Sequence, residues 1–508
     1  MSLFKAKISG ITRGITVLIA LMLQVVSMFG IVSLMRQYAP FMYIAVELTS
    51  VILAFILAND DKEYKEFWIV IVLVLPVFGY FLYFMWGRSS INSKTNKRLR
   101  KAEERYRFAL CQDYNAMQEL KRLHPNKVQI SRYLSAQGYP LYKNTEIKYF
   151  SLGDEFLKDL TEELKNAKKF IFLEFFIISG GEIVNEISEI LFQKAKEGVE
   201  VRLIMDDFGC LLLNDRSFRD NLKKNGIKYG VFGPIHQEIS RLSFNFRDHK
   251  KIVVIDGKTG YTGGVNLADE YANKIERFGH WKDSGVKLEG NAVFSLTSFF
   301  MEMWEAITGE EEDIFKYKTD VKKDIPGYVQ PYMGGPHKKI SNPSESTYTH
   351  TINKARDYLY ITTPYLVLDN KMRSDIICAA ESGVDVRIIT PKKYDKWYVH
   401  MVTQSNYGKL MEMGVKIYEY SKGFIHAKNI ITDDECGICG TVNMDYRSFY
   451  LHYECGVVIN EHPVVSEMKK DFIDTMKISK KLNYEEWKKR PLGQKIMQQV
   501  LKVFSPML

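Results

Sequence analysis

Two segments of the chain, one beginning at His249 and one at His426, carry the same arrangement of chemically active residues. Both match the pattern H-x-K-x4-D-x6-G-x2-N. An imidazole can act as a nucleophile, a base or an acid, and a lysine ammonium adds a compact positive charge beside it. Five specified residues rarely recur by chance, so two copies indicate a functional site rather than two core histidines. The candidate residues are His249, Lys251, Asp256 and Asn266 in the first copy and His426, Lys428, Asp433 and Asn443 in the second.

The elements that must position these groups are short buried strands. Residues i and i+2 of a strand share a face, so we expect each histidine to point with its lysine into one pocket. The run that follows, Ile252 to Ile255 in the first copy, is apolar and predicts a strand inside a sheet. The glycine then permits a tight turn that returns the asparagine amide toward the same pocket.

The region beyond about residue 145 alternates short β-branched or aromatic runs with polar helical stretches, which predicts an α/β fold. It also repeats itself. Residues 167–173 resemble 355–361, and residues 198–204 resemble 383–389 at a nearly constant offset. We therefore expect a first repeat over 146–308, a connector over 309–346 and a second repeat over 347–480.

With these motifs the chain resembles the phospholipase D superfamily, and within it the bacterial cardiolipin synthases. Further similar segments are 75–80, 206–209, 279–283 and 443–449. The resemblance implies two phospholipase D-like β/α sandwich repeats related by a pseudo-twofold axis, preceded by N-terminal transmembrane helices. It also implies that the two histidines meet over one substrate.

The resemblance implies distinct roles for the motif residues. His249 would attack phosphorus and form a phosphohistidine, and His426 would act as the general acid and later the base. Two histidines can divide these tasks only in opposite protonation states, which the repulsion between two imidazolium ions favours. Lys251 and Lys428 would hold the non-bridging oxygens.

The remaining candidates would support those four groups. Asn266 and Asn443 would donate hydrogen bonds to the substrate. Asp256 and Asp433, the aspartates of the catalytic motifs, are expected to brace the strands more than to touch substrate.

Two acids outside the motifs, Asp283 and Glu454, are candidates to accept the N–H of the far imidazole and fix its tautomer, or else are ordinary surface acids. Asp248 departs from the asparagine that the family often has before the first histidine. Its carboxylate would either raise the pKa of His249 or pair with Arg247.

The reaction that the resemblance implies is reversible phosphatidyl transfer between two phosphatidylglycerol molecules, giving cardiolipin and glycerol. Water or serine as the acceptor would instead make the chain a phospholipase D or a phosphatidylserine synthase, and a catalytically dead membrane scaffold is the alternative outside enzymes. No metal and no cofactor are expected, because lysines supply the positive charge. The expected partners are membrane phospholipids and not nucleic acid, and homo-oligomerisation is left open.

The N-terminal 87 residues hold most of the continuous apolar sequence and are expected to form a membrane anchor. Candidate spans are 14–35, 41–58 and 67–87, which give two or three transmembrane helices. The segment 88–145 begins with a basic run, which favours a juxtamembrane linker on the cytoplasmic side of a bacterial cell membrane. At the other end, 481–508 is expected to hold an amphipathic helix that lies at the membrane interface or docks on the core.

The overall composition fits this division of the chain. Hydrophobic residues make up 46% of the 508 and the net charge is +9, which excludes a disordered chain. Six scattered cysteines exclude a disulfide scaffold, and Cys436 and Cys439 are expected to be structural.

Overall fold

The computed structural model describes residues 39–59, 65–75, 78–87, 94–125, 127–211, 213–235, 245–321, 324–338 and 342–505, together with five isolated residues between 22 and 33. The predicted span 14–35 therefore lies outside the described residues, apart from those five positions.

The first repeat is a seven-stranded sheet with helices against it. Its strands are β1 (Thr145–Phe150), β2 (Phe170–Phe175), β3 (Glu200–Asp206), β4 (Lys228–Phe232), β6 (Lys251–Ile255), β7 (Thr259–Gly263) and β9 (Gly285–Gly290). Its helices are α8 (Gly153–Asn166), α9 (Glu182–Lys196), α10 (Arg216–Lys224) and α12 (Val293–Thr308), and two short strands, β5 (Arg247–Asp248) and β8 (His280–Lys282), lie outside the main order.

The second repeat builds the same architecture around a second sheet. Its strands are β10 (Tyr328–Gly334), β11 (Tyr358–Thr362), β13 (Asp385–Pro391), β14 (Lys416–Tyr420), β16 (Asn429–Thr432), β17 (Cys436–Gly440), β19 (His452–Asn460) and β20 (Ser479–Lys481). Its helices are α13 (Pro343–Lys354), α14 (Asn370–Glu381), α15 (Trp397–Glu412) and α16 (Val464–Lys477), and the short strands are β12 (Leu366–Val367), β15 (Gly423–Ile425) and β18 (Met444–Asp445).

The strand orders confirm the predicted duplication. The first sheet runs β1-β9-β7-β6-β2-β3-β4, and the second runs β10-β19-β17-β16-β11-β13-β14 before β20. Each strand of the first order has its counterpart at the same place in the second. The predicted strands after His249 and His426 are β6 and β16, the centre of each sheet.

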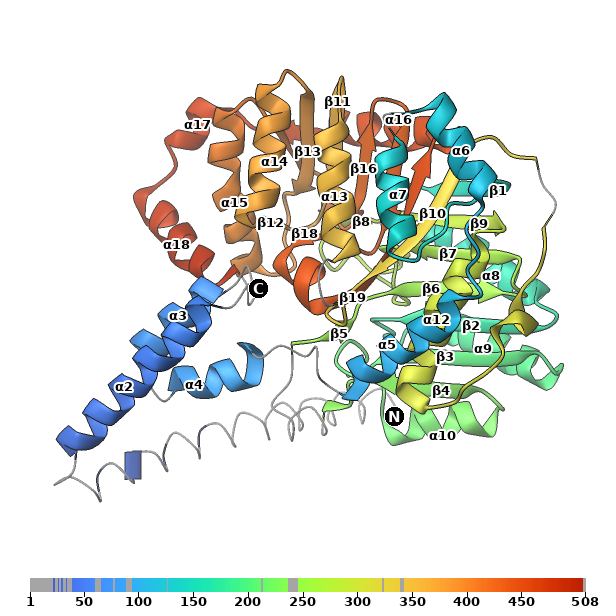
Figure 1. Cartoon of the computed structure of the whole chain (residues 1–508), viewed down its shortest axis with the longest axis horizontal. Coiled ribbons are helices and arrows are strands. Elements are labelled where there is room, and N and C mark those ends of the chain that lie inside the picture. The colour runs from blue at the N-terminus through green and yellow to red at the C-terminus, as the bar shows by residue number, and fades with distance from the viewer. Residues whose placement is uncertain are drawn as a thin grey trace.

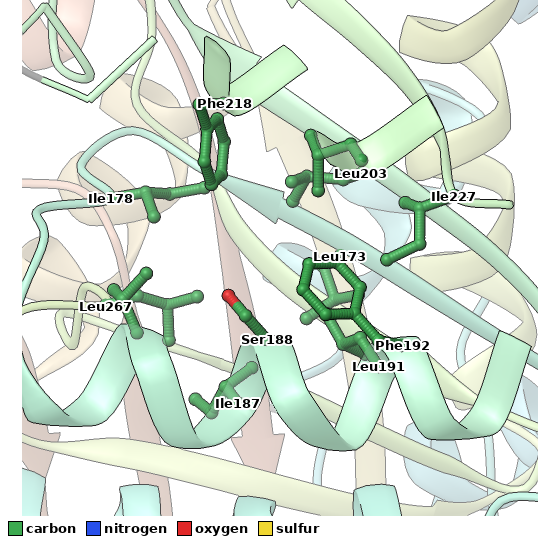
Figure 2. Close-up of a pocket in the computed structure, with 12 residues that line it drawn as sticks. Leu173, Ile178, Ile187, Ser188, Leu191, Phe192, Leu203, Phe218, Ile227 and Leu267 are labelled. Atoms are coloured by element: carbon green, nitrogen blue, oxygen red, sulfur yellow. The ribbon is translucent and has the colours of Figure 1, made fainter. Parts of the chain in front are cut away.

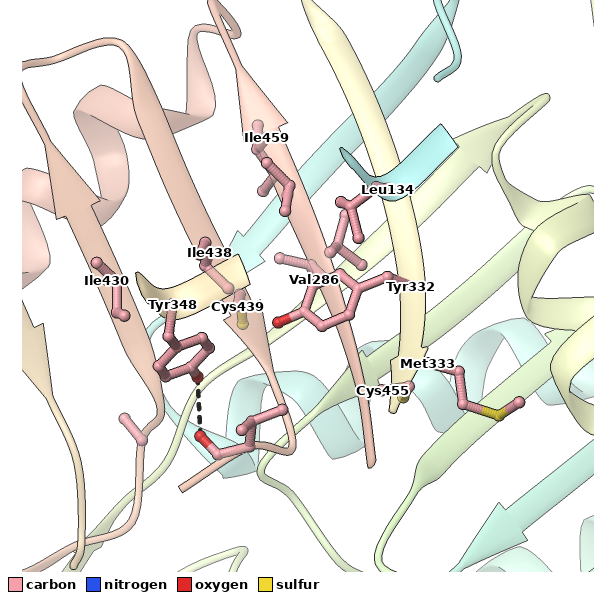
Figure 3. Packing of buried hydrophobic residues seen from close by; sticks show 14 of the residues in the cluster. Leu134, Val286, Tyr332, Met333, Tyr348, Ile430, Ile438, Cys439, Cys455 and Ile459 are labelled. Carbon is pink, nitrogen blue, oxygen red and sulfur yellow. Dashed lines mark hydrogen bonds between the residues drawn. The ribbon is translucent and has the colours of Figure 1, made fainter. Parts of the chain in front are cut away.

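The two repeats share one hydrophobic core. Figure 3 shows part of it, where Val286 of β9 lies near Ile438 of β17 and Tyr332 of β10. Thr262 and Cys455 also hydrogen-bond across the repeats at 3.1 Å. Because strands of both repeats bury side chains against one another, the repeats are held as one unit rather than as separate domains.

Short strands connect the repeats at the ends of the sheets. β5 pairs in parallel with the start of β19 (Figure 1), and β8 pairs in parallel with β15. The two pairings are equivalent under exchange of the repeats, which is the pseudo-twofold relation that the resemblance implies.

The expected connector, 309–346, contains structure that belongs to the second repeat. β10 lies within it and is the edge strand beside β19, as β1 is beside β9. Pro331 and Gly334 interrupt its apolar pattern, which explains why the sequence pattern favours a connector there. A short 3₁₀ helix, η3 (Ile314–Tyr317), precedes it.

The basic segment after residue 88 packs on the body of the protein. α5 (Lys94–Arg107) buries Leu99, Ala102 and Tyr106. Two of its cations pair with acids near the end of α12, since Arg105 contacts Glu305 at 3.6 Å and Lys101 contacts Glu311 at 3.7 Å. α6 (Tyr114–Leu123) and α7 (Val128–Ala136) follow.

The N-terminal helices project from this body (Figure 1). α2 (Ala39–Ala58) pairs with α3 (Lys65–Val74), which is followed by α4 (Phe78–Leu82) and a π-helical turn, η2 (Tyr83–Gly87). No helix within the described ranges is both long enough and apolar enough to cross a membrane. The predicted span 67–87 is thus divided among three elements, because Pro76 cannot donate a helical hydrogen bond and disfavours helix in the residue before it.

The C-terminal helix docks on the second repeat and exposes its other face. α17 (Tyr484–Lys488) and α18 (Leu492–Val503) follow β20, and α18 packs against α15. Phe504, after α18, makes an edge-to-face contact with Phe67 of α3 at 5.7 Å between ring centroids. Exposed apolar side chains remain on α18, namely Leu492, Ile496, Met497, Val500 and Val503.

Candidate active site

Each motif histidine precedes a central strand and takes its backbone partner from the other repeat. The His249 N–H donates to the carbonyl of Tyr453 at 2.9 Å, and the His426 N–H donates to the carbonyl of Lys282 at 2.7 Å. These bonds extend the β5–β19 and β8–β15 pairings by one residue. Each histidine therefore lies beside the residue that follows its backbone partner in the other repeat, Glu454 after Tyr453 and Asp283 after Lys282.

Those following residues are the two predicted carboxylates. His249 Nδ1 lies 2.9 Å from Glu454 Oε1, and His426 Nδ1 lies 2.6 Å from Asp283 Oδ2. An ionised carboxylate accepts, so in that state of the acids each imidazole carries its hydrogen on Nδ1 and leaves the Nε2 lone pair open. Both acids are fully buried, which excludes the alternative that they are ordinary surface acids.

The motif lysines fold back over the same histidines. Lys251 Nζ donates to the His249 carbonyl at 2.6 Å, and Lys428 Nζ donates to the His426 carbonyl. Burial lowers the pKa of Lys251 to about 7 and that of Lys428 to about 8, while the Glu454 and Asp283 carboxylates oppose the shift. Two ammonium groups buried this deeply favour an anionic ligand between them.

The hydrogen bonds that cross between the repeats bring the two motifs together, and the pKa shifts of the histidines agree with this. Burial lowers the pKa of His249 well below its usual value, and the charges of Lys428 and His426, from the other repeat, lower it further. In the same way Lys251 contributes to the low pKa of His426, about 4, for which burial is the main cause. Charges of both repeats act on each imidazole.

Both imidazoles are therefore neutral at pH 7. This differs from the expected pair of one neutral and one charged histidine, because both rings are more than nine-tenths buried beside cations. A bound anion would favour the protonated state of an imidazole in this site.

Aromatic side chains surround the two imidazoles. Phe176 lies 5.0 Å from the His249 ring, and Trp281 and Tyr271 lie 5.4 and 5.5 Å from the His426 ring. Phe424 lies 5.9 Å from the same ring. These rings pack around the histidines, and the motif spacing does not identify them, because they come from separate strands and loops.

The two motif asparagines differ in their contacts. Asn266 donates to the Tyr271 hydroxyl at 2.7 Å and accepts from the Ile177 N–H at 3.0 Å, so its amide holds two loops together. Asn443 is 4% exposed, and its Oδ1 has no hydrogen-bond partner among the described residues.

The motif aspartates lie away from the histidines, at the other end of their strands. Asp256 accepts three backbone N–H groups, from Lys168, Lys169 and Phe170, at 2.7–3.0 Å. Asp433 does the same for residues 356–358 at 2.9–3.0 Å. They anchor the starts of β2 and β11, and a strand rise of about 3.3 Å per residue separates them from the lysines by roughly 15 Å. This is the bracing role that the sequence predicts for the two motif aspartates.

Asp248 contacts neither of its expected partners. Its carboxylate lies 3.1 Å from Lys250 Nζ, which also donates to the buried carboxylate of Glu174. Arg247 instead lies 3.9 Å from Asp206. Lys250 points to the opposite face of the strand from His249, and the pairing with Asp248 belongs to that face.

One group of side chains has the composition of a metal site. Ligand atoms of His249, His452 and Glu454 lie within 4.8 Å of one another. However, Arg447 Nε donates to His452 Nε2 at 3.2 Å, which places the ring hydrogen of His452 on Nδ1, the nitrogen that faces Glu454. A protonated nitrogen cannot ligate, so this arrangement does not fit a metal ion.

Two other features do not contribute to the site. Cys436 and Cys439 are buried on β17, and burial raises the pKa of each thiol to about 12, as expected for structural cysteines. Figure 2 shows an apolar cavity of about 20 Å³ between α9, α10 and the first sheet, room for about one water molecule. Its lining of leucine, isoleucine and phenylalanine marks a packing void.

Comparison with known proteins agrees with the geometry. The family "Cardiolipin synthase, PLD-like domain" matches residues 160–279 and 348–476, and "Phospholipase_D-nuclease N-terminal" matches residues 48–88. The two long matches cover both repeats and both histidines.

Similar proteins match over most of the chain. An uncharacterized protein of Streptococcus mutans is 40% identical over 87% of this chain and 96% of its own length. Cardiolipin synthase 2 of Bacillus cereus is 33% identical over 89% of this chain and 88% of its own length. The crystal structure of phosphatidylserine synthase from Haemophilus influenzae aligns with a TM-score of 0.58 at 17% identity, over 75% of this chain and all of that one, which supports the fold. The family model matches both repeats, and relatives more than 30% identical align over most of the chain. The chain therefore belongs to the cardiolipin synthase family of the phospholipase D superfamily.

Proposed function

We propose that this protein is a cardiolipin synthase that transfers a phosphatidyl group from one phosphatidylglycerol to another and releases glycerol. The observation that carries the proposal is the crossed pair of buried histidines, each hydrogen-bonded to a carboxylate of the other repeat and flanked by a motif lysine. Family membership identifies the substrate class, and the site supplies the groups that the chemistry needs.

In the first step His249 Nε2 attacks the phosphorus of one phosphatidylglycerol. A phosphorus–nitrogen bond forms, the bond from phosphorus to the glycerol oxygen breaks, and His426 gives that oxygen its proton. Lys251 and Lys428 neutralise the non-bridging oxygens, and Glu454 stabilises the positive charge that develops on His249. The products are a phosphohistidine and free glycerol.

In the second step a glycerol hydroxyl of another phosphatidylglycerol replaces the one that left. His426, now neutral, takes the hydroxyl proton as the oxygen attacks phosphorus, and the bond to His249 breaks. Cardiolipin is released and both histidines return to their starting states. The aromatic side chains around the rings favour transfer over hydrolysis because they keep water from the intermediate.

The membrane arrangement is part of the same proposal. Residues 1–87 would anchor the chain as a multi-pass segment, and 146–308 and 347–480 would form the catalytic region on the cytoplasmic side. Support comes from the exposed apolar side chains of α2, which include Phe41, Ile44, Leu48 and Phe55, and from the exposed face of α18. Substrate lipids are the proposed partners, with no nucleic acid.

Purified protein supplied with phosphatidylglycerol alone tests the function. The expected products are cardiolipin and glycerol in equal amounts, and neither is formed by the His249→Ala variant. Phosphatidic acid without cardiolipin would identify a phospholipase D instead, and the absence of any product would favour a scaffold.

A further inference from the structure

A third histidine, His452, borders the nucleophile side of the site and has no part in the reaction proposed above. It is the first residue of β19 and lies in register with Arg247 of β5. Its ring centroid is 5.3 Å from that of His249, and the residue is 8% exposed. Residues i and i+2 of a strand share a face, so His452 points to the same side of β19 as Glu454.

The orientation of the His452 ring is set by Arg447. Arg447 Nε donates to His452 Nε2 at 3.2 Å, and a guanidinium can only donate. The ring must therefore accept at Nε2 and carry its hydrogen on Nδ1. Burial and the charge of Arg447 lower the pKa of His452 well below its usual value, in agreement with a neutral ring.

The Nδ1–H of His452 lies next to the carboxylate of Glu454. The distance from Nδ1 to Oε1 is 3.7 Å, and Nδ1 has no hydrogen-bond partner among the described residues. The same carboxylate already receives His249 Nδ1 at 2.9 Å and the Thr441 hydroxyl. A small rotation of the His452 ring would bring a third donor onto it, and a buried N–H without a partner favours that rotation.

We propose that His452 is a positioning residue for the nucleophile: held by Arg447, it presents an N–H to Glu454 and keeps this carboxylate ionised and directed at His249. An ionised Glu454 accepts from His249 Nδ1, and this leaves the His249 Nε2 lone pair free for phosphorus. The inference rests on the proposed function, since it concerns the rate of that reaction. Burial raises the pKa of Glu454 to about 8, so an additional donor matters at neutral pH.

Two substitutions separate the contacts of His452. The amide nitrogen of Asn falls where Nδ1 lies, so His452→Asn retains a donor to Glu454 and loses the contact with Arg447. The amide oxygen of Gln reaches the position of Nε2, so His452→Gln retains the contact with Arg447 and loses the donor to Glu454. The measurement is the pH dependence of kcat and kcat/KM for cardiolipin formation by the full-length protein.

The charged groups around His452 determine whether His452 itself titrates in the pH range of the assay. Arg447, Lys251, Arg247 and Lys396 all lower its pKa, so His452 itself remains neutral across the assay range. A shift of the acid limb therefore reports Glu454, whose pKa burial and Asp445 raise and Lys251, Thr441 and Ser448 lower. His452→Gln is expected to reduce kcat about tenfold and to move the acid limb upward by about one pH unit, with KM changed less than about twofold. His452→Asn is expected to stay within about threefold of the wild type, with its acid limb in place.

His280 provides the matched control. It also borders the site, at the start of β8, but its Nδ1 hydrogen-bonds to the Tyr420 hydroxyl at 2.9 Å. His280→Gln should leave the acid limb where it is. Thermal unfolding of each variant establishes that it is folded, and if His452→Gln is not, His452→Ala with added imidazole replaces it. Recovery of rate by imidazole would support the inference, and folded protein without recovery would overturn it.

The outcomes separate this inference from the proposed function. Equal activity of the Asn and Gln variants, whether high or low, without a shift of the acid limb would overturn the role of His452 while leaving the function intact. A wild-type protein that makes no cardiolipin would overturn the function and the inference with it.

Discussion

At the scale of single residues, burial gives the two motif histidines a chemistry that free imidazole lacks. His426 is 6% exposed and lies beside Lys428, and its pKa falls to about 4. In the unfolded chain the same group titrates near its ordinary value of about 6.5. The folded protein therefore binds fewer protons than the unfolded one at pH 5.

This difference predicts an acid-sensitive fold. A histidine whose folded pKa is lowered gives full stability above the unfolded pKa, and that stability is lost as pH falls below about 6.5. At pH 5 the loss from His426 alone is about 2 kcal/mol relative to pH 7. His426→Gln should therefore lose less free energy of unfolding than the wild type between pH 7 and pH 5, by about that amount. Denaturant unfolding at the two pH values measures it, and an identical loss in both proteins would show that His426 titrates normally.

For the motif aspartates we expect an effect on stability and not on activity. Asp433 accepts three backbone N–H groups at the start of β11 and lies at the far end of β16 from His426. Asp433→Ala should lower the free energy of unfolding by about 2 kcal/mol, because buried donors lose their acceptor. The folded variant should keep kcat within a few-fold of the wild type. A collapse of kcat at unchanged stability would instead place this carboxylate in the reaction.

Much of the site could be predicted residue by residue, but only where strand periodicity applies. The i, i+2 spacing predicts Lys251 beside His249, and two acids outside the motifs, Glu454 and Asp283, are the expected acceptors for the far imidazoles, where the structure has them. The pairing of Asp248 with Lys250 follows the same i, i+2 rule, whereas the contact of Lys250 with Glu174 could not be predicted, because only the fold brings those two residues together. No sequence pattern indicates a role for His452, since its contact with Arg447 depends on the π-helical turn η4 (Arg447–Leu451).

At the scale of elements, two short parallel pairings bring the repeats together at the site. In the β8–β15 pairing Gly423 lies opposite His280. A Cβ atom on Gly423 would lie 2.2 Å from the His280 carbonyl oxygen, so a side chain must separate the strands. The same pairing continues directly into the bond between His426 and Lys282.

Gly423→Ala should therefore impair catalysis without touching a catalytic group. Displacement of β15 moves His426 away from Asp283, and misplacement by about 1 Å can reduce the rate about a hundredfold. Gly493→Ala is the matched control, because nothing lies within 4 Å of a Cβ there. The measurement is the steady-state kcat of both variants. Equal kcat values would show that the β8–β15 pairing does not position His426.

The larger elements were predictable and the connecting ones were not. Apolar periodicity indicated the two α/β repeats, whereas β5, β8 and β15 are too short to have a periodicity and exist only because the repeats meet. Likewise β10 was assigned to the connector, since its pairing with β19 is a long-range contact.

At the scale of the whole molecule, an N-terminal helix meets the C-terminal helix, since Phe504 after α18 contacts Phe67 of α3 beside the exposed face of α18. If that face enters a lipid surface, Ile496→Asp with Val500→Asp should reduce kcat/KM on phosphatidylglycerol vesicles by about tenfold or more, because two apolar side chains no longer leave water. Gln499→Asp adds a charge to an exposed position of the same helix and should change little. Similar kcat/KM for all three proteins would place α18 away from the membrane.

The most direct test of the two-histidine site is to trap the covalent intermediate with phosphatidylglycerol that carries ³²P and to map the modified residue by mass spectrometry. Rapid quenching should give label on His249 in the wild type and none in His249→Ala. Label on His426, or label that persists in His249→Ala, would contradict the assignment of the nucleophile and the division of tasks between the repeats.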